Sequence, residues 1–205
     1  MTADTKQMLR MELLARRRDL PDDQRTPLDS ALTALLLAFV QGALAERAMS
    51  DAPPAPPYTV ATYVPLGMEP GTTSLPQQLK DLGVRVLLPI VGAPGPLDWA
   101  EYQDASSLAP ARMDLLEPTG PALGADAIAV ADVIFVPGLA GDSSGMRMGR
   151  GGGFYDQSLP LASDSAPRLL CLYPWELREH IPTEPHDVPV THIVTPTAIR
   201  SVNKH

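Results

Sequence analysis

Short apolar segments alternate with helical segments along this chain, and that alternation restricts the fold more than any other feature. Helical patterns or helix-ending residues mark the segments 3–19, 27–48, 72–82, 155–161 and 175–180. Apolar or β-branched runs mark candidate strands at 58–65, 84–89, 97–102, 129–136, 168–173 and 190–194. Strands that alternate with helices are typical of a largely parallel sheet covered on both faces. We therefore predict an α/β fold: a single three-layer α/β/α domain, residues 1–205, with a mixed, mostly parallel sheet.

Proline and glycine residues set several of the predicted boundaries. Pro21 ends the first helix, Pro27 begins the second, and Gly83 ends the third, which Thr72 or Thr73 caps. The stretch 50–57, SDAPPAPP, predicts an exposed and extended connector between the second helix and the first strand.

Composition and charge exclude several classes of protein. Apolar residues make up 44% of the chain and the net charge is −8, so an extended nucleic-acid groove is excluded and any anion site needs local basic groups. The longest apolar run, 34–40, is too short to span a bilayer. The one cysteine, Cys171, cannot form an internal disulfide and lies in an apolar run, which indicates core packing. With no signal peptide predicted, we expect a cytoplasmic monomer that binds small molecules.

The segment 136–159, VPGLAGDSSGMRMGRGGGFYDQSL, combines a strand end, a glycine-rich loop and a helix start. Glycines let backbone N–H groups approach an anion closely, and the positive end of a helix dipole adds to that attraction. Arg147 and Arg150 supply permanently charged, bidentate donors. Asp156 is a candidate Mg²⁺ ligand, because Mg²⁺ on a nucleotide is usually held by one or two carboxylates and phosphate oxygens. The segment predicts phosphate binding.

Other interpretations of this segment stay open at this point. Three successive glycines, Gly151 to Gly153, are also typical of a flexible turn, and neither common nucleotide-binding glycine signature is present. The run 141–145 matches the G-x-S-x-G nucleophile elbow, which would make Ser143 the nucleophile of a serine hydrolase with Asp187 and His192 as partners. That elbow requires a sharp turn from strand to helix, whereas Pro137 already ends the strand, so the hydrolase is the less favoured alternative.

Three further groups of residues are candidates for the site. Lys6, Arg10 and Arg17 recur near one face of the first helix, which is either a solvated face or a cationic face turned toward the glycine-rich loop. Glu69 follows a strand end, where open α/β sheets place ligand-binding residues. Asp187 precedes the last predicted strand and is a second candidate for Mg²⁺. The histidines at 180, 186 and 192 are interrupted by prolines, so a zinc site is not predicted.

At this point the chain resembles a known family, the 5-formyltetrahydrofolate cyclo-ligases, also called 5,10-methenyltetrahydrofolate synthetases. The segment 136–159 follows the family pattern V-P-G-L-A-F-D-x-x-G-x-R-L-G-x-G-x-G-Y-Y-D-x-x-L. Shorter matches occur in order at Lys6 and Arg10, YVPLGMEPGTTSL (63–75), LLPIV (87–91), LLEPTG (115–120) and PTEPHDVPVTHIVTPTAI (182–199). The departures are Gly141 for Phe, Met148 for Leu, Phe154 for Tyr, Gln157 for Arg and Thr191 for an acidic residue.

The resemblance implies a three-layer architecture similar to that of some sugar-phosphate isomerases and CoA-transferases. It also implies an ATP- and Mg²⁺-dependent enzyme that closes the ring of 5-formyltetrahydrofolate to give 5,10-methenyltetrahydrofolate, ADP and phosphate. In that reaction the formyl oxygen attacks the γ-phosphate, N10 attacks the resulting iminophosphate, and phosphate leaves. A homologue that binds folate or nucleotide without turnover is the alternative within the family.

The resemblance also implies roles for individual residues. Lys6, Arg147 and Arg150 would be catalytic, and Asp156 and Asp187 would hold Mg²⁺. ATP would be bound by Lys6, Gln7, Met8, Leu9, Arg10, Arg147, Met148, Gly149, Arg150, Gly151, Gly152, Gly153, Phe154 and Tyr155. The folate would be bound by Val64, Glu69, Arg150, Gly151, Gly152, Gly153 and Phe154. Glu69 suits the donor edge of the pterin, because a carboxylate only accepts hydrogen bonds.

Overall fold

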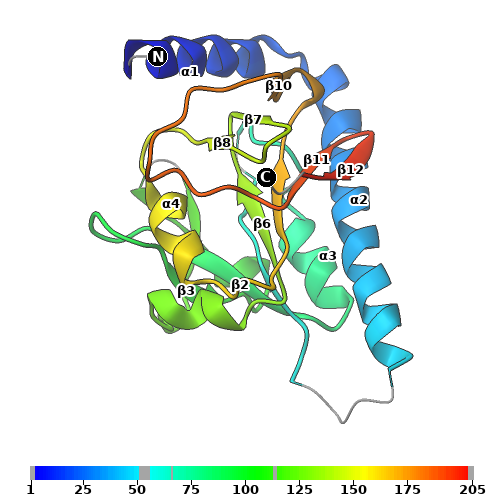
Figure 1. The fold of residues 1–205 in the computed structure, drawn as a ribbon. Coiled ribbons are helices and arrows are strands. Elements are labelled where there is room, and N and C mark those ends of the chain that lie inside the picture. Colours follow the sequence, from blue (N-terminus) through cyan, green and yellow to red (C-terminus); the bar gives the residue numbers. More distant parts are fainter. Residues whose placement is uncertain (1–2, 51–55, 66, 113–114, 203–205) are drawn as a thin grey trace.

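The computed structural model describes residues 3–50, 56–65, 67–112 and 115–202. Its main sheet has seven strands in the order β12-β11-β9-β6-β1-β2-β3 (Figure 1). In chain order these strands are β1 (Thr59–Ala61), β2 (Arg85–Ile90), β3 (Asp98–Glu101), β6 (Val133–Pro137), β9 (Arg168–Cys171), β11 (His192–Thr195) and β12 (Ala198–Ser201). The predicted connector at 50–57 includes residues 51–55, which lie outside the described residues.

The helices and the minor strands complete the fold. The α-helices are α1 (Ala3–Asp19), α2 (Asp22–Ala48), α3 (Leu75–Asp81) and α4 (Phe154–Ser158). The 3₁₀ helices are η1 (Ala105–Ser107), η3 (Ala125–Val130), η4 (Leu159–Leu161) and η5 (Pro174–Glu176). Two small sheets contain β10 (Leu177–Arg178) with β7 (Ala140–Asp142) and β8 (Arg147–Met148), and β4 (Leu108–Pro110) with β5 (Leu116–Pro118).

The predicted mixed, mostly parallel sheet is confirmed. The central strands β2, β1, β6, β9 and β11 pair in parallel, while β3 and β12 pair antiparallel at the two edges. Their carboxyl ends therefore meet at one edge of the sheet. In the sheet, β2 lies on one side of β1 and β6 lies on the other, so the strand order reverses direction between β1 and β6. Open α/β sheets bind ligands at such a point, beyond the carboxyl ends of the strands.

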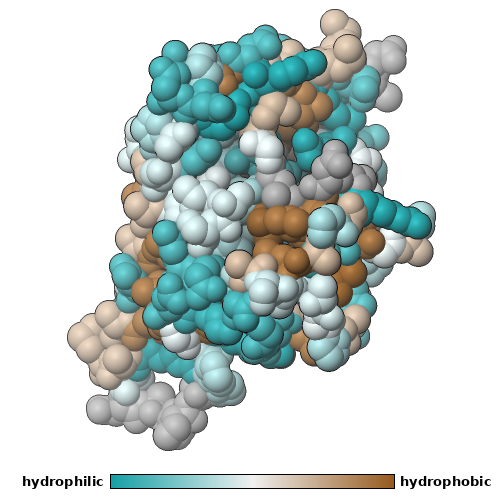
Figure 2. Space-filling view, turned by 180° about the vertical axis from the view of Figure 1, so that it is seen from behind, coloured by the Kyte–Doolittle hydropathy of each residue, from teal (hydrophilic) through white to brown (hydrophobic). Residues whose placement is uncertain are grey.

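Two hydrophobic cores lie on the two faces of the sheet, because alternate side chains of each strand point to opposite faces. Val133 and Phe135 of β6 join the core under α2 and α3, while Ile134 and Val136 join the core under η3, α4 and η4. Figure 1 shows α2 and α3 on one side of the sheet and α4 on the other. On the rear face of the molecule, apolar side chains gather in one patch bordered by hydrophilic ones (Figure 2).

A third, smaller core places α1 at the carboxyl edge of the sheet. Leu13 of α1 is fully buried with Leu139, Ala140, Met148 and Ile181. These partners belong to β7, β8 and the segments beside them, so α1 lies across the glycine-rich region (Figure 1). The predicted helix 3–19 is confirmed with the same bounds.

Other predicted helix starts were wrong. The second helix begins at Asp22, five residues before Pro27, because Asp22 and Asp23 favour the positive helix end and Asp22 pairs with Arg25. Ser74, and neither Thr72 nor Thr73, precedes α3; Thr72 instead donates its N–H to Thr33 Oγ1.

Several predicted strands were too long or were misassigned. The first two residues of the strand predicted at 129–136 belong to η3 and β6 begins only at Val133, since a short apolar run does not distinguish a strand from a buried helical turn. Only Thr59–Ala61 of 58–65 pairs as a strand, and the following residues leave the sheet. The predicted helix 175–180 is the single turn η5 followed by β10. The strand predicted at 190–194 is β11 (His192–Thr195), and it is followed by one more strand, β12.

The apolar composition of α2 is consistent with either a membrane-spanning helix or a helix that packs on the sheet. Among the described residues, α2 alone is long and apolar enough to cross a membrane, although the prediction from 34–40 excluded any such helix. Its side chains Leu32, Leu36 and Val40 are fully buried in the core on the sheet. We therefore interpret α2 as the core helix that covers this face.

Candidate active site

The main pocket, of about 350 Å³, opens at the carboxyl edge of the sheet. Val64 follows β1, Val91 follows β2, and Gly138 follows β6, and all three line it. A pocket of this size is at the lower end of the range typical of small-molecule sites, and its position between β1 and β6 is the expected one.

The structure brings most of the predicted site residues together in this pocket. Its lining contains Lys6, Arg10, Val64, Glu69, Arg147, Met148, Gly149, Arg150, Gly151, Gly152, Gly153, Phe154, Tyr155, Asp156 and Asp187. Gln7, Met8 and Leu9 are not among the lining residues; Gln7 is exposed, Met8 is 71% exposed, and Leu9 packs in the core beneath α1. The helix face with Lys6 and Arg10 thus faces the pocket, while Met8 faces away from it.

Lys6 lies between two carboxylates from the other end of the chain. Its Nζ donates to Glu184 Oε2 at 2.6 Å and to Asp187 Oδ2 at 2.8 Å, and it is only 6% exposed. Burial opposes its charge, but the hydrogen bonds and charges of Asp187 and Glu184 prevail and raise the pKa of Lys6 above 10.5. Lys6 therefore stays a cation, and the three groups together carry one net negative charge.

The same interactions keep both carboxylates ionised. Burial opposes the charge on Asp187, but hydrogen bonds from Lys6 and from the Glu184 N–H outweigh it and lower the pKa of Asp187 below 3.8. The hydrogen bond from Lys6 also lowers the pKa of Glu184. The donor atoms of Glu184, His186 and Asp187 lie within 4.8 Å of one another. Of the other histidines considered above, His180 lies near Asp142 and His192 contacts Thr191.

The glycine-rich segment folds as a hairpin that Asp142 organises. Asp142 is buried, and its Oδ1 accepts from Ser144 Oγ at 2.5 Å and from the N–H groups of Ser144 and Met146. Its Oδ2 accepts from the N–H of Ile181. The hairpin joins β7 to β8, so Ser143 lies in an exposed turn between strands and the strand-to-helix elbow of a hydrolase is absent here.

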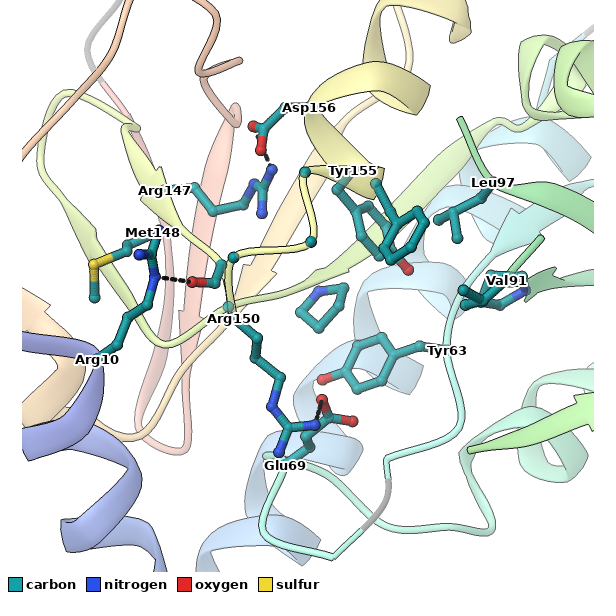
Figure 3. A pocket seen from close by; sticks show the side chains of 18 of the residues that line it. Arg10, Tyr63, Glu69, Val91, Leu97, Arg147, Met148, Arg150, Tyr155 and Asp156 are labelled. Atoms are coloured by element: carbon teal, nitrogen blue, oxygen red, sulfur yellow. Dashed lines mark hydrogen bonds and ion pairs between the residues drawn. The ribbon is translucent and has the colours of Figure 1, made fainter. Parts of the chain in front are cut away.

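Arg147 of β8 and Asp156 of α4 form a largely buried ion pair. Arg147 Nη2 donates to Asp156 Oδ1 at 2.5 Å, and the guanidinium lies 5.8 Å from the ring centre of Tyr155 (Figure 3). A side chain on Gly149 would place its Cβ 3.1 Å from Arg147 Nη1, so the absence of one leaves room for the guanidinium. Arg10 Nε donates to the carbonyl of Gly149 at 3.1 Å, which ties α1 to the loop.

The loop then turns into α4 at Gly153, whose φ of +68° is in the left-handed region that favours glycine. The predicted helix 155–161 appears as α4 followed by η4. Arg150 extends from this loop across the pocket, where its Nη1 lies 3.6 Å from Glu69 Oε1 (Figure 3). Its side chain is 51% exposed, while that of Glu69 is 11% exposed.

The segment that carries Glu69 is held by hydrogen bonds on both sides. Tyr63 Oη donates to the carbonyl of Pro70 at 2.8 Å, and the N–H of Gly71 donates to Asp29 Oδ1 at 3.1 Å. The Tyr173 hydroxyl donates to the same oxygen of Asp29. These hydrogen bonds position the segment that carries Glu69, and Tyr173 connects it to the side of α1 that carries Arg17.

An apolar wall faces these charged groups. Tyr63, Val91, Leu97 and Tyr155 lie around the same space (Figure 3). The Tyr155 hydroxyl is buried without a hydrogen-bond partner among the described residues, and burial raises its pKa far above 10.0. The tyrosine therefore stays neutral, and the wall suits a flat, largely apolar ring.

Sequence reasoning missed several residues of the pocket. Glu184 lines it, and so does Glu117, whose Oε1 accepts from the N–H of Val91 at 2.9 Å. Arg17, which was predicted on the same helix face as Lys6 and Arg10, lines it as well. The LLEPTG match and the spacing of Glu184 from Asp187 were the available signals. Gly141 lies outside the pocket: a Cβ there would meet Leu170 Cδ2 at 2.6 Å, so Leu170 occupies space that a side chain at this position would need.

Comparisons with known proteins identify the family of this chain. A model of the 5-formyltetrahydrofolate cyclo-ligase family matches residues 2–196. The chain is 41% identical over 201 residues to the 5-formyltetrahydrofolate cyclo-ligase of Mycolicibacterium smegmatis (strain ATCC 700084 / mc(2)155), covering 96% of each chain. It is 31% identical over 158 residues to the Escherichia coli (strain K12) 5-formyltetrahydrofolate cyclo-ligase, covering 76% of this chain and 87% of that one.

Solved structures show the same fold. The NMR structure of Aquifex aeolicus 5,10-methenyltetrahydrofolate synthetase superposes with a TM-score of 0.76 at 23% identity, covering 98% of this chain and 94% of that one. A 5,10-methenyltetrahydrofolate synthetase from Mycoplasma pneumoniae superposes with a TM-score of 0.68 at 19% identity, covering 93% and 98%. With a family match over nearly its whole length and a relative at 41% identity, this chain belongs to the 5-formyltetrahydrofolate cyclo-ligase family.

Proposed function

We propose that this chain catalyses the ATP- and Mg²⁺-dependent cyclisation of 5-formyltetrahydrofolate to 5,10-methenyltetrahydrofolate, with release of ADP and phosphate. The observation that carries the proposal is one pocket with two chemically different ends. Lys6, Arg10 and Arg147 line one end, Glu69 and Tyr63 line the other, and Arg150 reaches across from the glycine-rich loop to Glu69. A triphosphate and a reduced folate need these two environments side by side.

The reaction requires little covalent chemistry from the protein. The formyl oxygen attacks the γ-phosphorus and ADP leaves. N10 then attacks the activated carbon, loses its proton, and phosphate departs with the former formyl oxygen. Because phosphoryl transfer depends mainly on positioning and charge stabilisation, the arginines would neutralise the charge on the transferred group. No covalent nucleophile is needed, which agrees with Ser143 lying in an exposed turn outside the pocket lining.

The folate end depends on hydrogen bonding and packing. Glu69 would accept from the donor edge of the pterin, since its carboxylate offers only acceptors. Val64 and Phe154 line the same space and would pack on the ring. Phe154 lacks a hydroxyl, so at this position the wall supplies packing alone.

The carboxylates of the pocket fit a divalent cation. Asp187 and Asp156 both line it, and the group of Lys6, Glu184 and Asp187 keeps one excess negative charge. Asp187 and Asp156 would hold Mg²⁺ together with phosphate oxygens, as oxygen-preferring Mg²⁺ requires. When bound, the metal would screen the charge of the triphosphate.

Asp187→Asn is expected to raise the Mg²⁺ concentration for half-maximal turnover by about tenfold, since it removes the excess charge that attracts the cation. The measurement is a Mg²⁺ titration of the initial rate at fixed ATP. Asp23→Asn, an exposed carboxylate on α2 outside the pocket, is the matched control and should leave the titration unchanged. An unchanged Mg²⁺ requirement in Asp187→Asn would place the metal elsewhere.

Arg150→Ala is expected to raise the KM for ATP or for the folate by about tenfold while the melting temperature stays near that of the wild type. The side chain is half exposed and its contact with Glu69 is long, so its removal costs little stability. Steady-state kinetics with one substrate varied at a time would show which KM changes. Wild-type values for both would remove Arg150 from the proposed role.

The proposed function predicts that ATP consumption depends on the folate. A coupled assay for ADP should show release only when 5-formyltetrahydrofolate is present, with one ADP for each folate consumed. ADP release that is independent of the folate would contradict the proposal. We also expect a cytoplasmic monomer. Gel filtration with light scattering would measure its oligomeric state.

A further inference from the structure

We propose that Arg17, buried in the wall of the pocket, is a positioning residue that fixes α1 so that Lys6 and Arg10 meet the ATP end of the site. This inference rests on the proposed function. Arg17 is 2% exposed, and its Nε and Nη2 donate to Glu176 at 2.6 and 2.8 Å. Its Nη2 also donates to the carbonyl of Gly138 at 2.6 Å.

These bonds connect α1 to two segments that follow strands of the main sheet. Gly138 directly follows β6, and Glu176 ends η5, where its Oε2 also accepts from the N–H of Tyr173. Arg17 therefore joins α1 to the ends of two neighbouring strands at once. The guanidinium also lies 5.6 Å from the ring centre of Tyr173, which closes one side of it. A fixed fork with three short hydrogen bonds defines both the position and the rotation of the helix.

The spacing along α1 explains why this matters for ATP. Lys6, Arg10, Leu13 and Arg17 are separated by four, three and four residues, so they lie on one stripe of the helix. Lys6 lies about 16 Å along the axis from Arg17, so a tilt of about 5° at Arg17 would move it by about 1.4 Å. Displacements of this size at catalytic groups typically cost one or two orders of magnitude.

The opposite side of α1 supplies no comparable restraint. Met8 and Met11 are 71% and 63% exposed, and the pair between Glu12 and Arg178 lies at the surface. Leu13 and the hydrogen bonds of Lys6 and Arg10 also hold the helix, and Arg17 adds a buried anchor with three hydrogen bonds at its C-terminal end. Glu69 lies on the segment after β1, which Tyr63 and Asp29 hold by hydrogen bonds of their own, so loss of Arg17 should affect ATP more strongly than the folate.

The test separates positioning from stability by removing the ion pair in two ways. Arg17→Met alone leaves Glu176 charged and buried, and should therefore lower the melting temperature strongly. Adding Glu176→Gln removes that charge and should restore much of the stability, while the amide oxygen of the new side chain can still accept from the N–H of Tyr173. Arg18→Met, an exposed neighbour on the same helix, is the matched control and should behave as the wild type.

In the double variant we expect the KM for ATP to stay raised by about tenfold and the KM for 5-formyltetrahydrofolate to change by less than about twofold. A purely structural role predicts instead that the KM for ATP returns to the wild-type value together with the melting temperature, and that result would overturn the proposal. If the double variant does not fold, Arg17→Lys replaces it, because lysine keeps the charge but not the planar fork. A raised KM for ATP in that variant supports the proposal, and a wild-type KM for ATP overturns it.

Calorimetric titration with a non-hydrolysable ATP analogue makes the result independent of turnover. Analogue binding about tenfold weaker in the double variant supports the positioning role, and equal binding contradicts it. If the wild type binds the analogue but forms no methenyltetrahydrofolate, the proposed function fails while the positioning role is still decided by the two Kd values.

Discussion

Replacement of Arg147 by lysine is expected to lower kcat for the ATP-dependent cyclisation by at least about a hundredfold. The guanidinium is buried and aligned by Asp156 at 2.5 Å, and Gly149 leaves room for it. Lysine keeps the charge but loses the planar fork, which cannot be replaced by a single ammonium group at a bidentate site. Initial rates at saturating ATP and folate measure the effect directly, with circular dichroism as the check on folding.

Ser143→Ala is the matched control, because Ser143 lies in the same hairpin and is exposed outside the pocket. It should keep full activity. A serine hydrolase would show the reverse order, with activity lost in Ser143→Ala and retained in Arg147→Lys. Wild-type kcat in Arg147→Lys would mean that the guanidinium does not act on the transferred phosphoryl group.

Gly145→Ala is expected to lower the free energy of unfolding by about 3 kcal/mol, one of the largest effects of a single methyl group in this chain. Gly145 has a φ of +84°, and a Cβ there would lie 2.6 Å from the carbonyl oxygen of Val190. The Gly145 carbonyl also accepts from the N–H of Val190, so displacement of this backbone breaks the link between the hairpin and the segment before β11. Urea unfolding followed by fluorescence measures the change.

Gly42→Ala provides the opposite result in the same assay. Gly42 is an exposed residue inside α2, and a Cβ there meets nothing within 4 Å. Alanine should therefore raise the free energy of unfolding by about 0.5–1 kcal/mol through helix propensity. Equal, small effects of the two substitutions would show that the contact of Gly145 with Val190 is not a restraint on the fold.

The architecture was predictable because each central strand is buried on both faces and therefore appears as a continuous apolar run. The boundaries of the helices and strands were not predictable in the same way. The apolar residues of η3 and β6 follow one another closely, and their periodicity does not distinguish a 3₁₀ turn from a strand. The last strand, β12, was missed because its residues are partly or fully exposed and form no apolar run, and only its pairing with β11 defines it.

The candidate site was predictable where its residues are close in sequence or belong to recognisable matches. Arg147, Arg150 and Asp156 occur within ten residues of one another, and Lys6 and Arg10 share a helix face. The contacts between distant segments were not predictable: Glu176 is 159 residues from Arg17, and Glu184 is 178 residues from Lys6. Such pairs form only when the segments at the carboxyl edge of the sheet come together in the folded protein. No local sequence pattern predicts which of these segments will be in contact.

The most direct test of the central claim is the formation of 5,10-methenyltetrahydrofolate, followed by its near-ultraviolet absorbance. The purified protein is mixed with 5-formyltetrahydrofolate, Mg²⁺ and ATP, and the same mixture without ATP is the control. We predict that the absorbance band grows only in the complete mixture and stops when either substrate is exhausted. A flat trace in the complete mixture, with calorimetry showing that both substrates bind, would contradict the cyclo-ligase activity and leave a binding protein of the same family.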